Sequence, residues 1–226
     1  SILYAGVIGG VSGGIIGGGT SVINYKTAVT VGREIQRKGL DTDLIKRAKY
    51  TLSGFDIANE RAEAMKTEKP TGDVKETKEQ KKQRISVNKE AKYISKQSAE
   101  LASKIQENVS VYEKLRADPR KANSDAAAAA LGELRGNLFM AARGFEVDTV
   151  EAFLKETPDT ERKLYVDAIN EQLEHGEAAV TIMRAAIVPT VRNRYCARLL
   201  MDSFNISANN YRAFEGALNK LLPSDR

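Results

Sequence analysis

The residue types that most often perform chemistry are few in this sequence, and their spacing does not form a catalytic site. His175 is the single histidine and follows Glu171 by four residues, so the two share a helix face, while Cys196 is the single cysteine. A zinc site needs more ligands than one His–Glu pair, and none is marked here. Nothing around Cys196 resembles a nucleophile motif, and an isolated cysteine is usually a small buried apolar group. We therefore predict a non-enzymatic protein with no catalytic residue, no metal site and no cofactor.

Four arginines cluster around Pro189 and are the candidate anion-binding residues. Arginine side chains bind phosphate through two parallel hydrogen bonds, as in lipid head groups or nucleic acid. Only Tyr195 lies nearby as a stacking platform, which gives weak support to nucleic-acid binding. The alternative is a solvated or ion-paired face of a helix. The four residues are Arg184, Arg192, Arg194 and Arg198, of which the last two share one helix face.

The most regular pattern is in residues 2–25, which contain no charged side chain. Small residues recur there every four positions, and in a helix this spacing stacks them on one face. Such a face lets two helix backbones approach closely, whereas the aliphatic row beside it suits lipid. The predicted helix-packing rows are Gly6, Gly10, Gly14, Gly18 and Gly9, Gly13, Gly17, and the predicted membrane-facing row is Leu3, Val7, Val11, Ile15.

The glycines also limit what this segment can do alone. Each interior glycine costs about 1 kcal/mol relative to alanine, so an isolated helix in water is disfavoured and lipid or a partner must compensate. The segment just reaches the roughly 20 apolar residues that cross a bilayer. It lacks the GxGxxG phosphate loop, and no Lys or Arg precedes the apolar run as in a signal peptide. We expect self-association first and membrane insertion second, with a buried glycine-rich hairpin in a soluble assembly as the alternative.

The elements that would position these residues are all helical. The chain has 226 residues, only five prolines, no tryptophan, 29% charged residues and a net charge of +5. Its middle is rich in Ala, Lys and Glu, which favours helices, and one cysteine excludes an internal disulfide framework. We predict an all-α fold with an N-terminal glycine-zipper helix, a long helical hairpin and a C-terminal helical bundle. The predicted parts are 1–25 (glycine zipper), 26–66 (helices), 67–84 (charged linker), 85–117 (long heptad-patterned helix) and 124–222 (helical bundle). Within them, we expect helices to end at Gly39 and at Gly144, and Ser124 or Asp125 to start the first helix of the bundle.

The helix predicted over 85–117 has the clearest periodicity, a coiled-coil-like seam in steps of three and four residues. We expect it to pair with 42–66 in a hairpin, and we expect polar Asn108 to set register. The seam comprises Val87, Ala91, Ile94, Ser98, Leu101, Ile105, Asn108, Tyr112 and Leu115.

Three functional hypotheses follow. The first is a protein that self-associates and engages a membrane through residues 2–23, in a delivery apparatus such as a phage internal or DNA-ejection protein, or as a secreted membrane-active factor. The second is a structural subunit of a soluble or virion assembly without lipid contact. The third is a secreted effector that binds a host protein through residues 124–222. The expected partners are a homo-oligomer or a larger protein assembly and membrane lipid, with weaker support for nucleic acid.

Overall fold

The computed structural model describes residues 24–71, 75–175, 194–204, 206, 210 and 212–213. These residues are 84% helical and contain no strand, so the all-α prediction is confirmed for them. The helices in chain order are α2 (Tyr25–Arg37), α3 (Asp41–Met65), α4 (Lys78–Arg116), α5 (Asp125–Glu156), α6 (Asp159–Glu174) and α8 (Arg194–Ser203).

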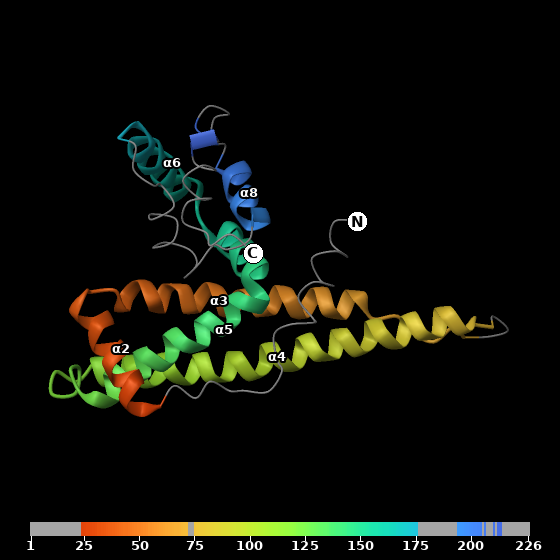
Figure 1. Cartoon of the computed structure of the whole chain (residues 1–226), viewed down its shortest axis with the longest axis horizontal. Helices are drawn as coiled ribbons and strands as arrows, with labels where there is room; N and C mark the ends of the chain where they lie inside the picture. Colours follow the sequence, from red (N-terminus) through yellow and green to blue (C-terminus); the bar gives the residue numbers. More distant parts are fainter. Residues whose placement is uncertain are drawn as a thin grey trace.

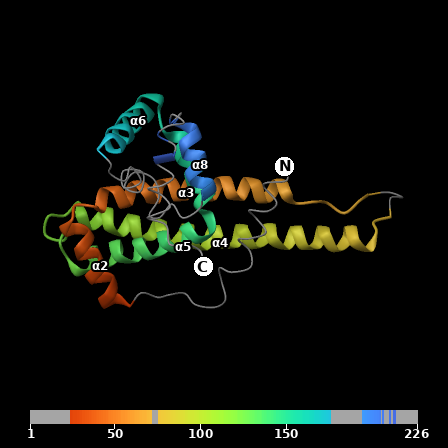
Figure 2. The ribbon, with the colours of Figure 1, turned by 45° about the horizontal axis from the view of Figure 1, so that its top comes forward.

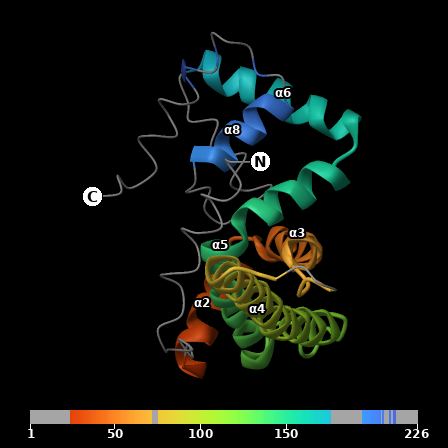
Figure 3. The same cartoon turned by 90° about the vertical axis from the view of Figure 1, so that its right-hand side faces the viewer.

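The longest feature is the antiparallel hairpin of α3 and α4, in which α4 projects past the end of α3 (Figure 1). α2 packs at the opposite end of the hairpin, and the first half of α5 lies beside α2, α3 and α4 (Figures 1 and 3). We call these four parts the hairpin lobe. The second half of α5, α6 and α8 form the C-terminal lobe, which lies on the α3 side of the hairpin (Figure 2).

An apolar core fills the hairpin lobe, and α5 supplies its centre. Leu131 and Leu134 of α5 are fully buried, as is Ile105 of α4. On the α3 side the rings of Phe55 and Phe145 meet edge to face, with centroids 4.9 Å apart. Burial of one such side chain contributes about 1.5–3 kcal/mol, so we assign most of the stability of this lobe to these contacts.

A second core connects α5 with α6 and α8. Phe153 of α5 is fully buried and lies 5.3 Å from the ring of Tyr50 and 6.0 Å from that of Tyr165, between ring centroids. Ile169 of α6 and Cys196 of α8 belong to the same cluster. Because Tyr50 lies on α3, this aromatic group holds the C-terminal lobe against the hairpin.

The course of α5 differs from the prediction. The helix expected to close at Gly144 runs on to Glu156, and only Phe145 (φ −130°, ψ 24°) departs from helical geometry, forming a kink. The Thr149 hydroxyl donates to the Phe145 carbonyl at 2.9 Å, so this carbonyl has a partner. The predicted boundary at residue 124 does not separate two units, because the first half of α5 shares its core with α2, α3 and α4.

Side-chain caps begin α2 and α5. The Asn24 side chain accepts from the Thr27 amide at 2.9 Å. The Ser124 hydroxyl accepts from the Ala127 amide at 3.2 Å, so of the two predicted residues, Ser124 and Asp125, the cap is Ser124. Gly39 has φ 66° directly after α2, which is the left-handed geometry that commonly ends a helix. The stop predicted at Gly39 is therefore confirmed.

α4 begins at Lys78, seven residues before the predicted boundary at 85, so the end of the predicted linker 67–84 is helical. Thr77 and Gln80 form a capping box, in which each side chain bonds to the backbone amide of the other residue. The polar run that suggested a linker consists largely of Lys, Gln and Glu, which are good helix formers once a cap nucleates the first turn.

The two glycine rows and the aliphatic row lie outside the described residues. No helix in the described part of the chain combines the length and the apolar character that crossing a bilayer requires.

Candidate functional site

The closest helix contact of the hairpin lobe is the crossing of α2 and α5. A Cβ atom added to Gly32 would lie 1.7 Å from the carbonyl oxygen of Ala128, and one added to Gly132 would lie 2.0 Å from that of Ala28. The contact is reciprocal, because each helix presents an alanine and, four residues later, a glycine. Both alanines are fully buried. This is small-residue packing in which two helix backbones touch.

Polar contacts fix the register at the edge of this crossing. Arg33 of α2 forms an ion pair with Asp125 in the first turn of α5. The Gln36 side-chain amide donates to the Ala122 carbonyl at 3.0 Å, in the loop between α4 and α5. α2 is thus attached to the first turn of α5 and to the loop between α4 and α5.

A charged cluster lies where α3 meets the second half of α5. Arg61 donates to Asp148 at 2.5 Å and to Glu151 at 2.9 Å, and the side chain of Asp148 is only 9% exposed. Gly54 permits this approach, since an added Cβ would lie 2.7 Å from the Thr149 nitrogen. The cluster therefore stands just after the kink of α5, at the joint between the two lobes.

Two effects act in opposite directions on the pKa of the buried Asp148 carboxyl at this joint. Burial raises the pKa of Asp148 to about 6, and the neighbouring charge of Arg61 offsets only part of that increase. Burial also raises the pKa of the Cys196 thiol, with smaller contributions from Glu146 and Asp148. A buried thiol with a raised pKa is a poor nucleophile, so Cys196 is a core residue in this structure.

The seam of α4 carries polar contacts to both of its neighbours. The Asn108 amide donates to Glu133 at 3.0 Å, and its carbonyl oxygen accepts from Asn137 at 2.7 Å. Toward α3, the Tyr112 hydroxyl donates to Asp41 at 2.6 Å, and burial together with this carboxylate raises the pKa of Tyr112 to about 12. A one-turn slip of α4 would break these bonds, so they select one register.

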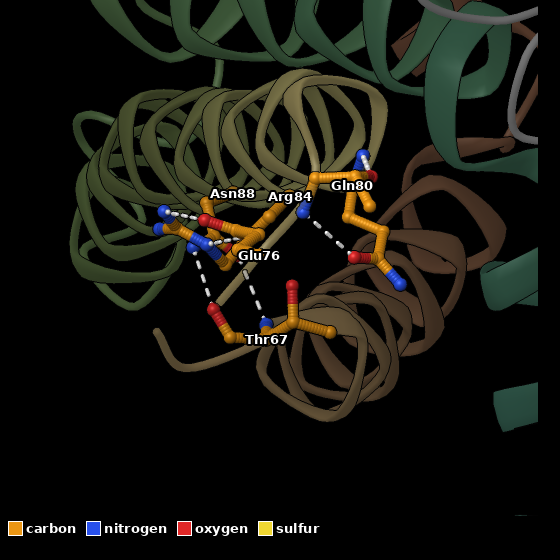
Figure 4. A network of polar contacts seen from close by, with 6 residues as sticks. Thr67, Glu76, Gln80, Arg84 and Asn88 are labelled. Atoms are coloured by element: carbon orange, nitrogen blue, oxygen red, sulfur yellow. Dashed lines mark hydrogen bonds and ion pairs between the residues drawn. The ribbon is translucent and has the colours of Figure 1, made fainter. Parts of the chain in front are cut away.

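The tip of the hairpin is closed by a separate polar network, shown in Figure 4. The backbone amide of Thr67, just past α3, donates to the Asn88 side chain at 3.0 Å, and the Asn88 amide donates back to the Thr67 carbonyl at 2.9 Å. Arg84 binds the Glu76 carboxylate at 2.8 and 3.1 Å and keeps the pKa of Glu76 below its usual range. The loop between the helices is thereby attached to the side of α4.

Only some of the sequence-predicted candidates lie within the described residues. His175 caps the C-terminus of α6 through its backbone, its side chain is exposed, and no group of three metal-binding side chains occurs in the described ranges. Arg194 begins α8 and Arg198 lies within it, while Arg184 and Arg192 are outside the described residues.

Two features of the structure were missed from the sequence. The Ala–Gly pairs of α2 and α5 have the same four-residue spacing as the N-terminal glycines and could have been found by it. The lysines of the first turns of α4 were assigned to a linker. Their spacing of three and four residues was the signal that could have placed them on one helix face.

No known protein family matches this chain, and comparisons with curated proteins and with solved structures give no match either.

Proposed function

We propose that this chain is a non-enzymatic helical protein that self-associates through residues 2–23 and engages a membrane through the same segment. Its setting is a delivery apparatus, either as a phage internal or DNA-ejection protein or as a secreted membrane-active factor. The observation that supports self-association is the crossing of Ala28–Gly32 on Ala128–Gly132, where small residues four apart bring two helix backbones into contact.

The same spacing is present in residues 2–23 in a stronger form. The crossing of α2 and α5 uses one alanine–glycine step on each helix. The N-terminal segment contains two adjacent rows of such steps, and no charged residue interrupts them. Two copies of this segment, each helical, would expose backbone to one another along a face several turns long, and lipid would cover the aliphatic row.

The proposal is tested in the full-length chain by Gly10→Ile combined with Gly14→Ile. The new side chains block one glycine row but make the segment more apolar. We therefore expect crosslinked oligomers on vesicles to disappear while flotation with the vesicles persists. The matched control is Val11→Leu with Ile15→Leu, which alters the aliphatic row by similar volumes and is expected to retain both oligomers and flotation.

Two outcomes would contradict the proposal. If the glycine double variant retains its oligomers, the glycine rows do not drive self-association. If the unaltered chain forms the same oligomers in solution and does not float with vesicles, the membrane half is wrong. The structural subunit of a soluble or virion assembly then replaces it.

A further inference from the structure

The positive charge of this chain is concentrated at the tip of the hairpin. Residues 66–96 contain ten Lys or Arg and five Asp or Glu, a net charge of +5 that equals the net charge of the whole chain. The remaining residues are therefore balanced. The tip is also the part of the hairpin farthest from α2, α6 and α8 (Figures 1 and 2).

Within this region five of the six lysines of α4, together with Ile85, form one exposed stripe. These six residues follow one another in steps of three and four, which keeps them within one helix face. Ile85 lies in the same stripe and is 51% exposed. The two acidic residues of this part of α4, Glu79 and Glu90, fall about 100–120° away around the helix. The stripe, called the lysine stripe below, comprises Lys78, Lys82, Ile85, Lys89, Lys92 and Lys96, all exposed.

Ion pairs inside the described chain occupy little of the lysine stripe. Only Lys96 has a carboxylate within ion-pair distance among the described residues, and Glu100 lies at 3.8 Å. Arg84, the one arginine between 78 and 96, is bound to Glu76 on another side of the helix. Four of the five lysines are therefore available to an external anion.

The lysine stripe lies on the first turns of α4, and contacts with the neighbouring loop fix the position of these turns. The first buried residue of α4 is Ala91, so the turns before it extend beyond the support of α3. The bonds between Thr67 and Asn88 hold these turns against the loop (Figure 4). Eighteen residue steps of α-helix span about 27 Å. The lysines thus form a straight, preorganised line rather than a flexible tail.

We infer that the lysine stripe binds the surface of an anionic phospholipid bilayer, with the lysines at the head groups and Ile85 inserted between them. This contact is additional to the membrane engagement proposed for residues 2–23 and does not depend on it. Each lysine near such a surface adds to the attraction, and long lysine side chains keep their charge in the polar layer while an apolar neighbour enters the acyl boundary.

The composition and shape of the stripe favour lipid over nucleic acid. Single-stranded nucleic acid stacks on aromatic rings. The stripe contains no aromatic residue, and its centre is the aliphatic Ile85, a residue suited to the acyl boundary of a bilayer. A straight line of charges can meet a flat bilayer along its whole length, whereas a curved phosphate backbone leaves a straight helix after a short contact.

The main test compares two full-length triple variants on vesicles of phosphatidylcholine with or without phosphatidylserine. Lys82→Gln, Lys89→Gln and Lys92→Gln should weaken the part of the binding that depends on phosphatidylserine by roughly 100-fold. The matched control, Lys49→Gln, Lys104→Gln and Lys114→Gln, removes three exposed lysines away from the tip and should retain binding within a few-fold. The stripe-dependent part should also vanish between about 0.1 M and 1 M salt.

A second measurement reports on Ile85 directly, because the chain contains no tryptophan. Ile85→Trp should show a blue-shifted emission when phosphatidylserine vesicles are added. Val111→Trp is the control, since Val111 is 41% exposed on the same helix but beyond the stripe. Its emission should stay unchanged.

The inference is overturned if the two triple variants bind phosphatidylserine vesicles equally, or if Ile85→Trp shows no shift. It is also overturned if the unaltered chain binds a DNA duplex more tightly than these vesicles and the stripe variant loses that binding. Its failure is separable from failure of the proposed function. Gly10→Ile with Gly14→Ile removes oligomers and should leave the phosphatidylserine-dependent binding intact, whereas the stripe variant should leave the oligomers intact.

Discussion

α5 makes two close crossings, one with α2 and one with α3, and each depends on a glycine. At the first, Gly132 faces the Ala28 backbone, and alanine side chains fill the surroundings. At the second, Gly54 faces the backbone at Thr149, and the buried Asp148 carboxylate lies beside it. The same way of bringing backbones together is thus used once in an apolar setting and once in a charged setting.

The difference predicts how each contact responds to conditions. The α2 crossing contains no ionisable side chain at its centre, and the Arg33–Asp125 pair at its edge is exposed and contributes little. Packing therefore determines the strength of this crossing, and pH and salt should alter it little. The α3 crossing holds Arg61 and Asp148 away from water, where an unpaired charge is costly. Because this second crossing lies at the kink near Phe145, the joint between the two lobes is the part of the fold that protonation can change.

The largest effect is expected when the charged crossing loses its cation. Arg61→Met keeps much of the side-chain volume but leaves Asp148 buried beside Glu151 without a positive partner. Breaking a buried pair in this way typically costs about 3–5 kcal/mol. Urea unfolding at neutral pH should show a loss of that size. Lys49→Met, an exposed change on the same helix, is the control and should shift the unfolding free energy by less than about 0.5 kcal/mol.

A result equal to that of the Lys49 control would show that the Arg61 bonds at the joint contribute nothing net. The comparison between the two crossings would then rest on packing alone. If the Arg61→Met variant instead regains part of its unfolding free energy at acidic pH, the contrast between the charged and the apolar crossing is supported, because a protonated Asp148 needs no cation beside it.

The next effect is the pH dependence of Asp148 itself. Its pKa is about 6 in the folded chain against an ordinary value of 3.8, and the first cause is burial. Because the folded value is the higher one, the protonated carboxyl favours the folded state. That contribution is fully present below about pH 4 and is lost as the pH rises through about 6, up to about 3 kcal/mol for a shift of about two pKa units.

The measurement is the unfolding free energy of the unaltered chain minus that of Asp148→Asn, which cannot titrate at this position. The difference should decrease between about pH 4 and about pH 7. A flat or rising difference would contradict the assignment. The same subtraction with a variant of the α2 crossing should be flat, which separates the two crossings in one experiment.

At the α2 crossing we expect a smaller change in unfolding free energy, and for Gly→Ala its sign should be opposite to the one usual in a helix. In an exposed helix, Gly→Ala stabilises by about 1 kcal/mol. Gly132→Ala should instead destabilise by about 2 kcal/mol, because its Cβ would lie 2.0 Å from the Ala28 carbonyl oxygen and α2 must move away. Gly54→Ala, with its nearest atom at 2.7 Å, should lose less. A stabilised Gly132→Ala would show that the crossing is looser than the structure indicates.

Local signals explain which parts of the fold were predictable. The left-handed Gly39, the cap at Ser124 and the period of the α4 seam are each set within a few residues, so the sequence alone predicts them. The start of α4 is also set by a local signal, the capping box of Thr77 and Gln80. That signal was missed because the two residues lie inside a charged run that resembles a solvated loop.

Other features depend on segments far apart in the chain. Arg61 and Asp148 are 87 residues apart, and nothing in the pattern around either one indicates the other. Likewise, the spacing of Ala28 and Gly32 is visible in the sequence, but its partner on α5 is fixed only by how the whole hairpin lobe packs. The kink at Phe145 also depends on tertiary packing. Gly144, directly before it, predicts a helix end, but the buried contacts of both halves of α5 keep the helix continuous.

The smallest expected effect concerns the kink that separates the two crossings. Thr149 lies on α5 and Thr157 is the residue that caps its C-terminus, and both are buried. Each donates its hydroxyl to the carbonyl of a phenylalanine four residues earlier, at 2.9 and 2.6 Å. Replacement by valine removes one hydrogen bond at nearly constant volume, which costs about 1 kcal/mol. Both variants should lose about that much in urea unfolding. Only Thr149→Val should also speed amide exchange around residues 145–149, because only that bond lies at the kink. If Thr157→Val has the same effect there, the kink does not depend on the Thr149 bond, and the backbone contact with Gly54 must hold it instead.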